Sequence, residues 1–192
     1  MRKATAAALG AAVLFCALLA LLAARSLPYF LSPYARQNSL QHLTQAVAQG
    51  DGPAQAVSLP HSFTGLAART KVTVTLTVTV QPGDYLYVKS VYAPLRVYAD
   101  GVLIYEYGQA GAYPSYLTDP ATGVALVALP GTGACRLQLE YLSPAARSTL
   151  TVHPLLLGGQ AAVLQYLWET LGFTFAFSIL LGMSGLFLLL IG

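Results

Sequence analysis

Hydrophobic and polar residues alternate strictly from Lys71 to Val80, where lysine or threonine occupies every second position of KVTVTLTVTV. Because neighbouring side chains of a strand point to opposite faces, this period of two predicts one buried and one exposed face. The turn-forming QPGD (Gln81 to Asp84) and a second β-rich run, Tyr85 to Ala93, follow it. The pattern is typical of an antiparallel sheet that packs on a core.

A hairpin is predicted around Asp100-Gly101, which separates the apolar runs LRVYA and VLIYEYG. A type I′ turn needs positive φ at both central residues, and an Asp-Gly pair adopts this readily. Further strands are expected at VALVALP, CRLQLEYL and STLTVHPLLL, with a long loop from Ala110 to Gly123. About seven short strands between Gly and Pro turns indicate an all-β fold, an antiparallel β-sandwich or jelly roll.

Two uncharged apolar runs lie at the ends of the chain, Ala4 to Ala24 and Thr170 to Gly192. Each reaches the roughly 20 residues that a helix needs to cross a bilayer. We therefore expect two transmembrane helices that flank the sandwich. A cleaved signal peptide is the alternative for the first run. Because the chain stops inside apolar sequence at Gly192, we also expect it to be a fragment of a longer protein.

These patterns predict four segments. They are a membrane anchor over 1–25, a linker over 26–54 with one helical turn near Leu40 to Val47, a β-sandwich over 55–160 and a second membrane helix over 161–192. Arg2 and Lys3 precede the first run and Arg25 follows it, which favours a cytoplasmic N-terminus and an extracytoplasmic central domain. Membrane lipid, and a second copy of the chain through the helices, are the expected partners of these segments.

Composition supports a membrane protein and excludes nucleic acid as a partner. Hydrophobic residues make up 56% of the chain and charged residues 9%, with a mean hydropathy of +0.60. The net charge of +3 is spread thinly, whereas nucleic-acid binding calls for a clustered basic face.

Catalysis, metals and cofactors are not expected. A glycosidase needs two facing carboxyl groups; Asp84 and Asp100 are explained as turn residues, and Glu106 and Glu140 should face solvent on strands. We therefore expect no enzyme activity.

The histidines His42, His61 and His153 are far apart in the chain and lack the short spacing of a metal site. Cys135 opens a strand and is expected to be a small buried hydrophobe.

Ligand binding through tyrosine is the remaining chemistry. Tyrosine presents both an apolar ring and a hydroxyl, which suits sugars, although tyrosines in strands also serve core packing. Eight of the twelve tyrosines lie close together: Tyr85, Tyr87, Tyr92, Tyr98, Tyr105, Tyr107, Tyr113 and Tyr116. The loop position of the last two favours binding. The candidate ligand-binding residues are Arg96, Tyr98, Tyr107, Tyr113 and Tyr116. For Arg96, a cross-strand ion pair with Glu106 is the alternative.

The stretch SVYAPLRVYADGVLIYEYG resembles the sugar-binding-like jelly roll of family 2 glycoside hydrolases. The order LPHSF, RVYADGVLIYEYG, LPGTG, YLSP and HPLLLGG, leading into an apolar run, is similar to the N-terminal sensor region of bacterial membrane signalling proteins. This resemblance covers about Ala56 to Gly192. It implies a galactose-binding-like jelly roll that senses a carbohydrate or other small molecule. Such regions are tied to a diguanylate cyclase or histidine kinase, and this sequence contains neither. Ala145 stands where relatives often carry an aromatic, so this copy is expected to lack part of a sugar platform.

Two functions remain. One is the ligand-sensing domain of a membrane signal-transduction protein that lacks its output module. The alternative is a non-signalling surface protein that binds carbohydrate or cell-wall polymer, or serves in assembly.

Overall fold

The computed structural model describes residues 40–191, so the anchor expected over 1–25 lies outside the described residues. Its contacts divide the chain into two compact units, and the unit Ser39–Val163 holds all the described strands. The other unit includes the chain from Leu164 onward.

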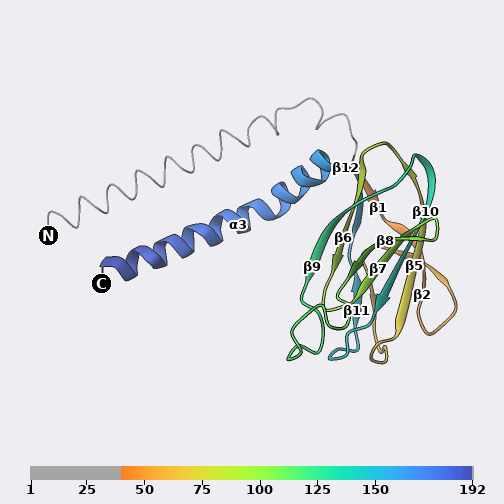
Figure 1. The fold of residues 1–192 in the computed structure, drawn as a ribbon, viewed down its shortest axis with the longest axis horizontal. Coiled ribbons are helices and arrows are strands. Elements are labelled where there is room, and N and C mark those ends of the chain that lie inside the picture. Colours follow the sequence, from red (N-terminus) through yellow and green to blue (C-terminus); the bar gives the residue numbers. More distant parts are fainter. Residues whose placement is uncertain (1–39, 192) are drawn as a thin grey trace. The chain divides into compact units, whose positions relative to one another are not determined.

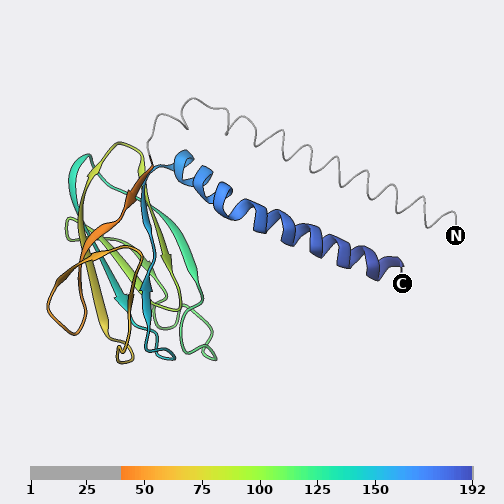
Figure 2. The same cartoon turned by 180° about the vertical axis from the view of Figure 1, so that it is seen from behind.

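The strands of the first unit form two antiparallel sheets and a short ribbon, and Figure 1 and, from behind, Figure 2 show the two sheets as layers. The four-stranded sheet has the order β1 (Gln41–Leu43), β12 (Leu155–Gly159), β6 (Asp84–Ser90) and β9 (Gly123–Ala128). The six-stranded sheet has the order β3 (Gln55–Ser58), β2 (Gln45–Gln49), β5 (Lys71–Val80), β10 (Gly133–Leu142), β7 (Leu95–Ala99) and β8 (Val102–Tyr107). The ribbon pairs β11 (Leu150–Val152) with β4 (His61–Phe63). The predicted all-β antiparallel sandwich is thus confirmed.

The core lies between the two sheets and follows from the alternation in the sequence. β5 has the bounds that its pattern predicts, and its aliphatic residues are buried while its threonines face outward. From β10, Leu137, Leu139 and Tyr141 join them, and Leu86 and Val88 of β6 cover them from the other sheet. Full burial of each such side chain is worth about 1.5–3 kcal/mol, so this layer is the main source of stability.

The predicted Asp100-Gly101 hairpin is confirmed. The two residues have φ of 48° and 83°, as a type I′ turn requires. The structure adds a second role for Asp100: its N–H donates to Arg136 O at 2.9 Å, and its carboxylate accepts the Arg136 N–H at 2.8 Å. The turn is therefore fixed to β10 by two hydrogen bonds.

The helical turn expected near Leu40 to Val47 is wrong, because β1 and β2 occupy this segment. β2 alternates between exposed and buried positions, and its Ala46 and Ala48 enter the core beside β5. The sandwich accordingly begins before the expected boundary at Gln55. The buried residues of β2 are small alanines next to glutamines, so the hydrophobic alternation of this segment was too weak to indicate a strand.

Helix α3 runs from Gln160 to Ile191 and begins directly after β12. Within residues 40–191, no helix combines the length and the apolar character needed to cross a membrane. The membrane crossing expected over 161–192 is therefore not supported by this finding.

The sandwich has two distinct ends. Gly159, where β12 ends, pairs with Asp84 at the start of β6, beside the turn that follows β5. The opposite end carries the segments 64–70, 91–94, 108–122 and 143–149, which we call the loop end (Figure 1). The chain thus leaves the sandwich at the end opposite to these loops.

Candidate functional site

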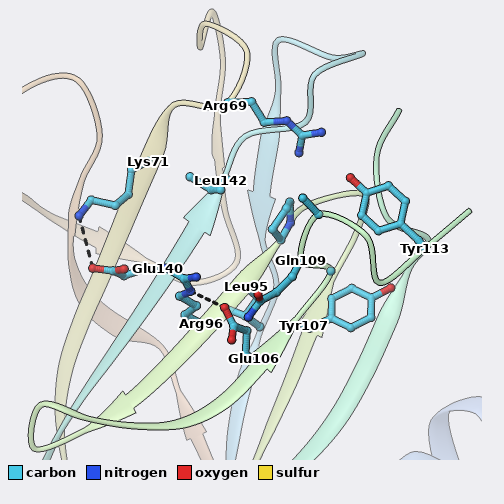
Figure 3. Close-up of a pocket in the computed structure, with 13 residues that line it drawn as sticks. Arg69, Lys71, Leu95, Arg96, Glu106, Tyr107, Gln109, Tyr113, Glu140 and Leu142 are labelled. Carbon is cyan, nitrogen blue, oxygen red and sulfur yellow. Dashed lines mark hydrogen bonds and ion pairs between the residues drawn. The ribbon is translucent and has the colours of Figure 1, made fainter. Parts of the chain in front are cut away.

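A pocket of about 480 Å³ lies on the outer face of the six-stranded sheet, beside the loop end (Figure 3). Strand ends and the segment that follows β8 supply most of its lining. The lining residues are Arg69, Lys71, Pro94, Leu95, Arg96, Glu106, Tyr107, Gly108, Gln109, Ala110, Tyr113, Glu140 and Leu142.

A row of charged side chains crosses the floor of the pocket from strand to strand. Arg96 on β7 lies opposite Glu140 on β10 and opposite Glu106 on β8. Its Nε is 2.5 Å from Glu106 Oε1, and Lys71 Nζ is 3.4 Å from Glu140 Oε1. The expected ion pair of Arg96 with Glu106 is confirmed, and its hydrogen bond raises the pKa of the guanidinium. Hydrogen-bond donors and acceptors therefore alternate along the floor.

Glu140 is held in place by two further side chains of the same sheet. Gln138 Nε2 donates to its Oε1 at 3.1 Å, and the Tyr98 hydroxyl donates to its Oε2 at 3.4 Å. Tyr98 does not line the pocket. The structure thus places this candidate behind Glu140, where it orients a carboxylate of the floor.

Tyr107 forms one wall at the end of β8. Its hydroxyl donates to Ala121 O at 2.8 Å, and a Cβ at Gly123 would come within 2.6 Å of its ring. Partial burial raises the pKa of this phenol. Gly108 has φ +71°, and a Cβ there would meet Pro120 at 2.8 Å. Two glycines therefore let segment 108–122 pack tightly against the ends of β8 and β9.

Arg69, which lines the pocket, is held in place by Asp119. Arg69 has φ 62°, and its guanidinium donates to Thr118 O at 2.7 Å and lies 3.2 Å from Asp119 Oδ1. The buried Asp119 carboxylate also accepts the N–H groups of Ala145 and Ala146 at 2.8 and 3.0 Å. One carboxylate thus connects three segments of the loop end.

Ser143 adds a second link at the base of these loops. Its buried hydroxyl donates to Ala67 O at 2.6 Å and accepts the Thr70 N–H at 2.9 Å. The segment that carries Arg69 is therefore fixed to the end of β10.

No protein-family model and no curated protein sequence matches this chain. Solved structures with similarity include an FMN-binding β-glucuronidase from F. prausnitzii L2-6, with 16% identity over 63% of this chain and a TM-score of 0.44. A β-glucuronidase from Ruminococcus gnavus, solved with uronic deoxynojirimycin, shows 10% identity over 63% and a TM-score of 0.41. The CBM36-1 domain of a xylanase from the hindgut metagenome of Trinervitermes trinervoides shows 13% identity over 64% and a TM-score of 0.34.

The chain spans 22% and 29% of the two glucuronidases and 98% of the CBM36-1 domain.

The structure brings three of the five candidate residues together. Arg96, Tyr107 and Tyr113 line the pocket, whereas Tyr98 lies behind Glu140. Tyr116 is 82% exposed and is not a lining residue.

Sequence reasoning missed Arg69, Lys71, Gln109 and Glu140 as pocket residues. The alternation of β5 and β10 already placed Lys71 and Glu140 on the outward face of neighbouring strands, which was a usable signal. No sequence signal marked Arg69 as a pocket residue, because its position depends on a positive φ and on an aspartate far away in the chain.

Metal-ligating side chains do not cluster in the described part of the chain. Among residues 40–191, no group of three His, Cys, Asp or Glu side chains could hold a metal ion. Cys135 is buried in the core, as expected, and burial raises the pKa of its thiol.

Proposed function

We propose that the β-sandwich is a binding domain for a carbohydrate or a similar small polar molecule, and that the pocket is its site. The observation that carries this proposal is the alternating row Lys71, Glu140, Arg96 and Glu106, with the Tyr113 side chain on the loop beside it (Figure 3). Sugar hydroxyls both donate and accept hydrogen bonds, so an alternating row satisfies neighbouring hydroxyls. A pocket of about 480 Å³ also falls within the usual range of small-ligand sites.

Binding without hydrolysis is the chemistry that this row favours. A glycosidase needs one carboxyl group that donates a proton and a second that acts as base or nucleophile. Glu106 lies against Arg96, and Glu140 lies against Lys71. Each carboxylate thus already accepts hydrogen bonds from side chains of the sheet, an arrangement that suits the binding of polar groups.

We further propose that this domain is the extracytoplasmic, ligand-sensing part of a membrane-attached signalling protein. The proposal rests on the two uncharged runs of the sequence and on the resemblance to sensor regions. It also rests on connectivity: β12 lies within the four-stranded sheet, between β1 and β6, and continues into α3 without an intervening residue. Because the pocket lies on the other sheet, a ligand would act on the helix by shifting the six-stranded sheet against the four-stranded sheet that contains β12.

A binding measurement with two matched variants tests the proposed site. The whole chain is purified in a polyoxyethylene detergent, which has no sugar headgroup, and is titrated with labelled mono- and oligosaccharides. Tyr113→Ala removes a lining side chain, whereas Tyr116→Ala removes an exposed tyrosine of the same loop that does not line the pocket. We expect the first to weaken binding about tenfold, or ~1.4 kcal/mol, and the second to leave it unchanged. Equal effects of both variants, or no binding to any sugar, would contradict the proposal.

The sensing part has its own test, because the single tryptophan of the chain, Trp168, lies in α3. A signalling domain predicts that a saturating ligand changes Trp168 fluorescence. Binding with no change at Trp168 would favour the non-signalling surface protein instead.

A further inference from the structure

We infer that the ligand is an acidic saccharide, and that its carboxylate binds between Lys71 and Arg96. This inference rests on the proposed function and specifies the ligand class of the same pocket. It depends on which of the charged groups in the pocket a ligand can reach.

The cations of the pocket are far more accessible than the carboxylates. The side chains of Lys71 and Arg96 are 61% and 52% exposed, whereas those of their partners Glu140 and Glu106 are 18% and 24% exposed. Two cationic groups therefore stand above two recessed anions. A ligand that enters from solvent meets N–H donors before it meets carboxylates.

Both cations keep unused donors. Arg96 binds Glu106 through Nε, and across residues 40–191 neither of its terminal nitrogens has a hydrogen-bond partner. A carboxylate can receive two parallel hydrogen bonds from a guanidinium, which gives strong and directional binding. Lys71 Nζ makes one long contact of 3.4 Å with Glu140, although an ammonium carries three donors. Both groups can thus bind a ligand without losing their present partners.

The accessible charges of the lining also favour an anion. Arg69 is paired with the buried Asp119, and Glu106 and Glu140 are recessed, so Lys71 and Arg96 are the charged groups that a ligand reaches most readily. The cross-strand arrangement fixes Arg96 beside Glu140, so the two accessible cations flank the same recessed carboxylate. An acidic group of the ligand would accept hydrogen bonds from both cations, and the sugar ring would then lie toward Tyr113.

Matched acidic and neutral sugars test this inference. Galacturonic and glucuronic acid trisaccharides are each compared with the same trisaccharide whose carboxylates have been reduced to primary alcohols. The whole chain is used in polyoxyethylene detergent. We expect the acidic member of a pair to bind at least tenfold more tightly at low salt, with the advantage falling as salt rises from about 0.05 to 0.5 M.

Three variants locate the effect. Lys71→Gln and Arg96→Gln should each remove most of the preference for the acidic sugar. Arg136→Gln is the control, because Arg136 is an exposed cation on the outward face of β10 that does not line the pocket. It should leave the preference unchanged. A preference that survives both pocket variants would overturn the inference.

The outcomes separate the inference from the proposed function. Equal binding of acidic and neutral sugars, still weakened by Tyr113→Ala, overturns the acidic ligand and supports a saccharide pocket. If neither member of any pair binds, both proposals are overturned.

Discussion

Arg69 and Asp119 form an ion pair across two loops, with Nη2 of the arginine 3.2 Å from Oδ1 of the aspartate. The side chain of Asp119 is only 7% exposed, and its two oxygens also accept the backbone N–H groups of Ala145 and Ala146. The pair therefore does more than join two charges. It holds the wall of the pocket to segment 143–149 and keeps two part-buried N–H groups satisfied.

Asp119→Ala should therefore be strongly destabilising. The substitution leaves two N–H groups without acceptors and Arg69 without its anion, so we expect the free energy of unfolding to fall by about 2–3 kcal/mol. Asp51→Ala is the control, because within residues 40–191 exposed Asp51 makes only a 3.5 Å contact with Thr70 Oγ1. Urea unfolding measures both variants. A loss as small for Asp119→Ala as for Asp51→Ala would show that the carboxylate does not organise the loop end.

Tyr141→Phe should leave stability unchanged or raise it by up to about 1 kcal/mol. Tyr141 is fully buried, burial raises the pKa of its phenol, and its hydroxyl has no hydrogen-bond partner within the described part of the chain. Removing an unpaired buried hydroxyl removes a desolvation cost. Tyr141→Ala, by contrast, should cost about 3–5 kcal/mol through the cavity it leaves. A marked loss on Tyr141→Phe in thermal or urea unfolding would mean that the hydroxyl is bonded.

Gly123→Ala should damage both stability and the pocket. Its Cβ would lie 2.6 Å from the Tyr107 ring, so the ring must move, and overpacking of this kind costs about 1–3 kcal/mol. Because Tyr107 is a wall of the pocket, sugar affinity should fall as well. Gly52→Ala is the matched control, since a Cβ there meets nothing within 4 Å. Identical unfolding midpoints for the two variants would show that the Tyr107 ring has room to adjust.

Stability should depend on the ionisation of His153. Partial burial, and then the positive charge of Lys89, lower the pKa of this imidazole in the folded state. The unfolded state, with a pKa near 6.5, therefore binds more protons in the window just below that value, and stability is lost as the pH falls through it.

Urea midpoints between about pH 7.5 and 5 measure this effect. Wild type should lose more stability over this interval than His153→Gln, whose side chain does not titrate. Parallel curves would exclude His153 as the source.

The parts of the fold that follow from local pattern could be predicted from the sequence. β5 and the Asp100-Gly101 hairpin have the expected positions, because a strict alternation and a turn with two positive φ angles are properties of neighbouring residues. β2 was missed, since its buried residues are alanines and its strand character comes from pairing with β5 and β3.

The candidate site was predicted only in part, for a related reason. Arg96 and its partner Glu106 lie across a short hairpin, so their spacing in the sequence fixes their contact. Glu140 reaches Arg96 only because β10 inserts between β5 and β7, and Arg69 depends on an aspartate fifty positions away. Pocket walls that depend on such long-range contacts leave no recognisable pattern among neighbouring residues in the sequence.

The most direct test of the account is a map of amide chemical shifts on the whole chain as a uronic-acid trisaccharide is titrated to saturation. The account predicts that the largest shifts fall on Lys71, Arg96, Gln109, Tyr113 and Glu140, which line the pocket, with smaller shifts at the turns 81–83 and 129–132 at the opposite end of the sandwich. Saturable shifts centred on those turns, or no shifts at the pocket, would contradict it.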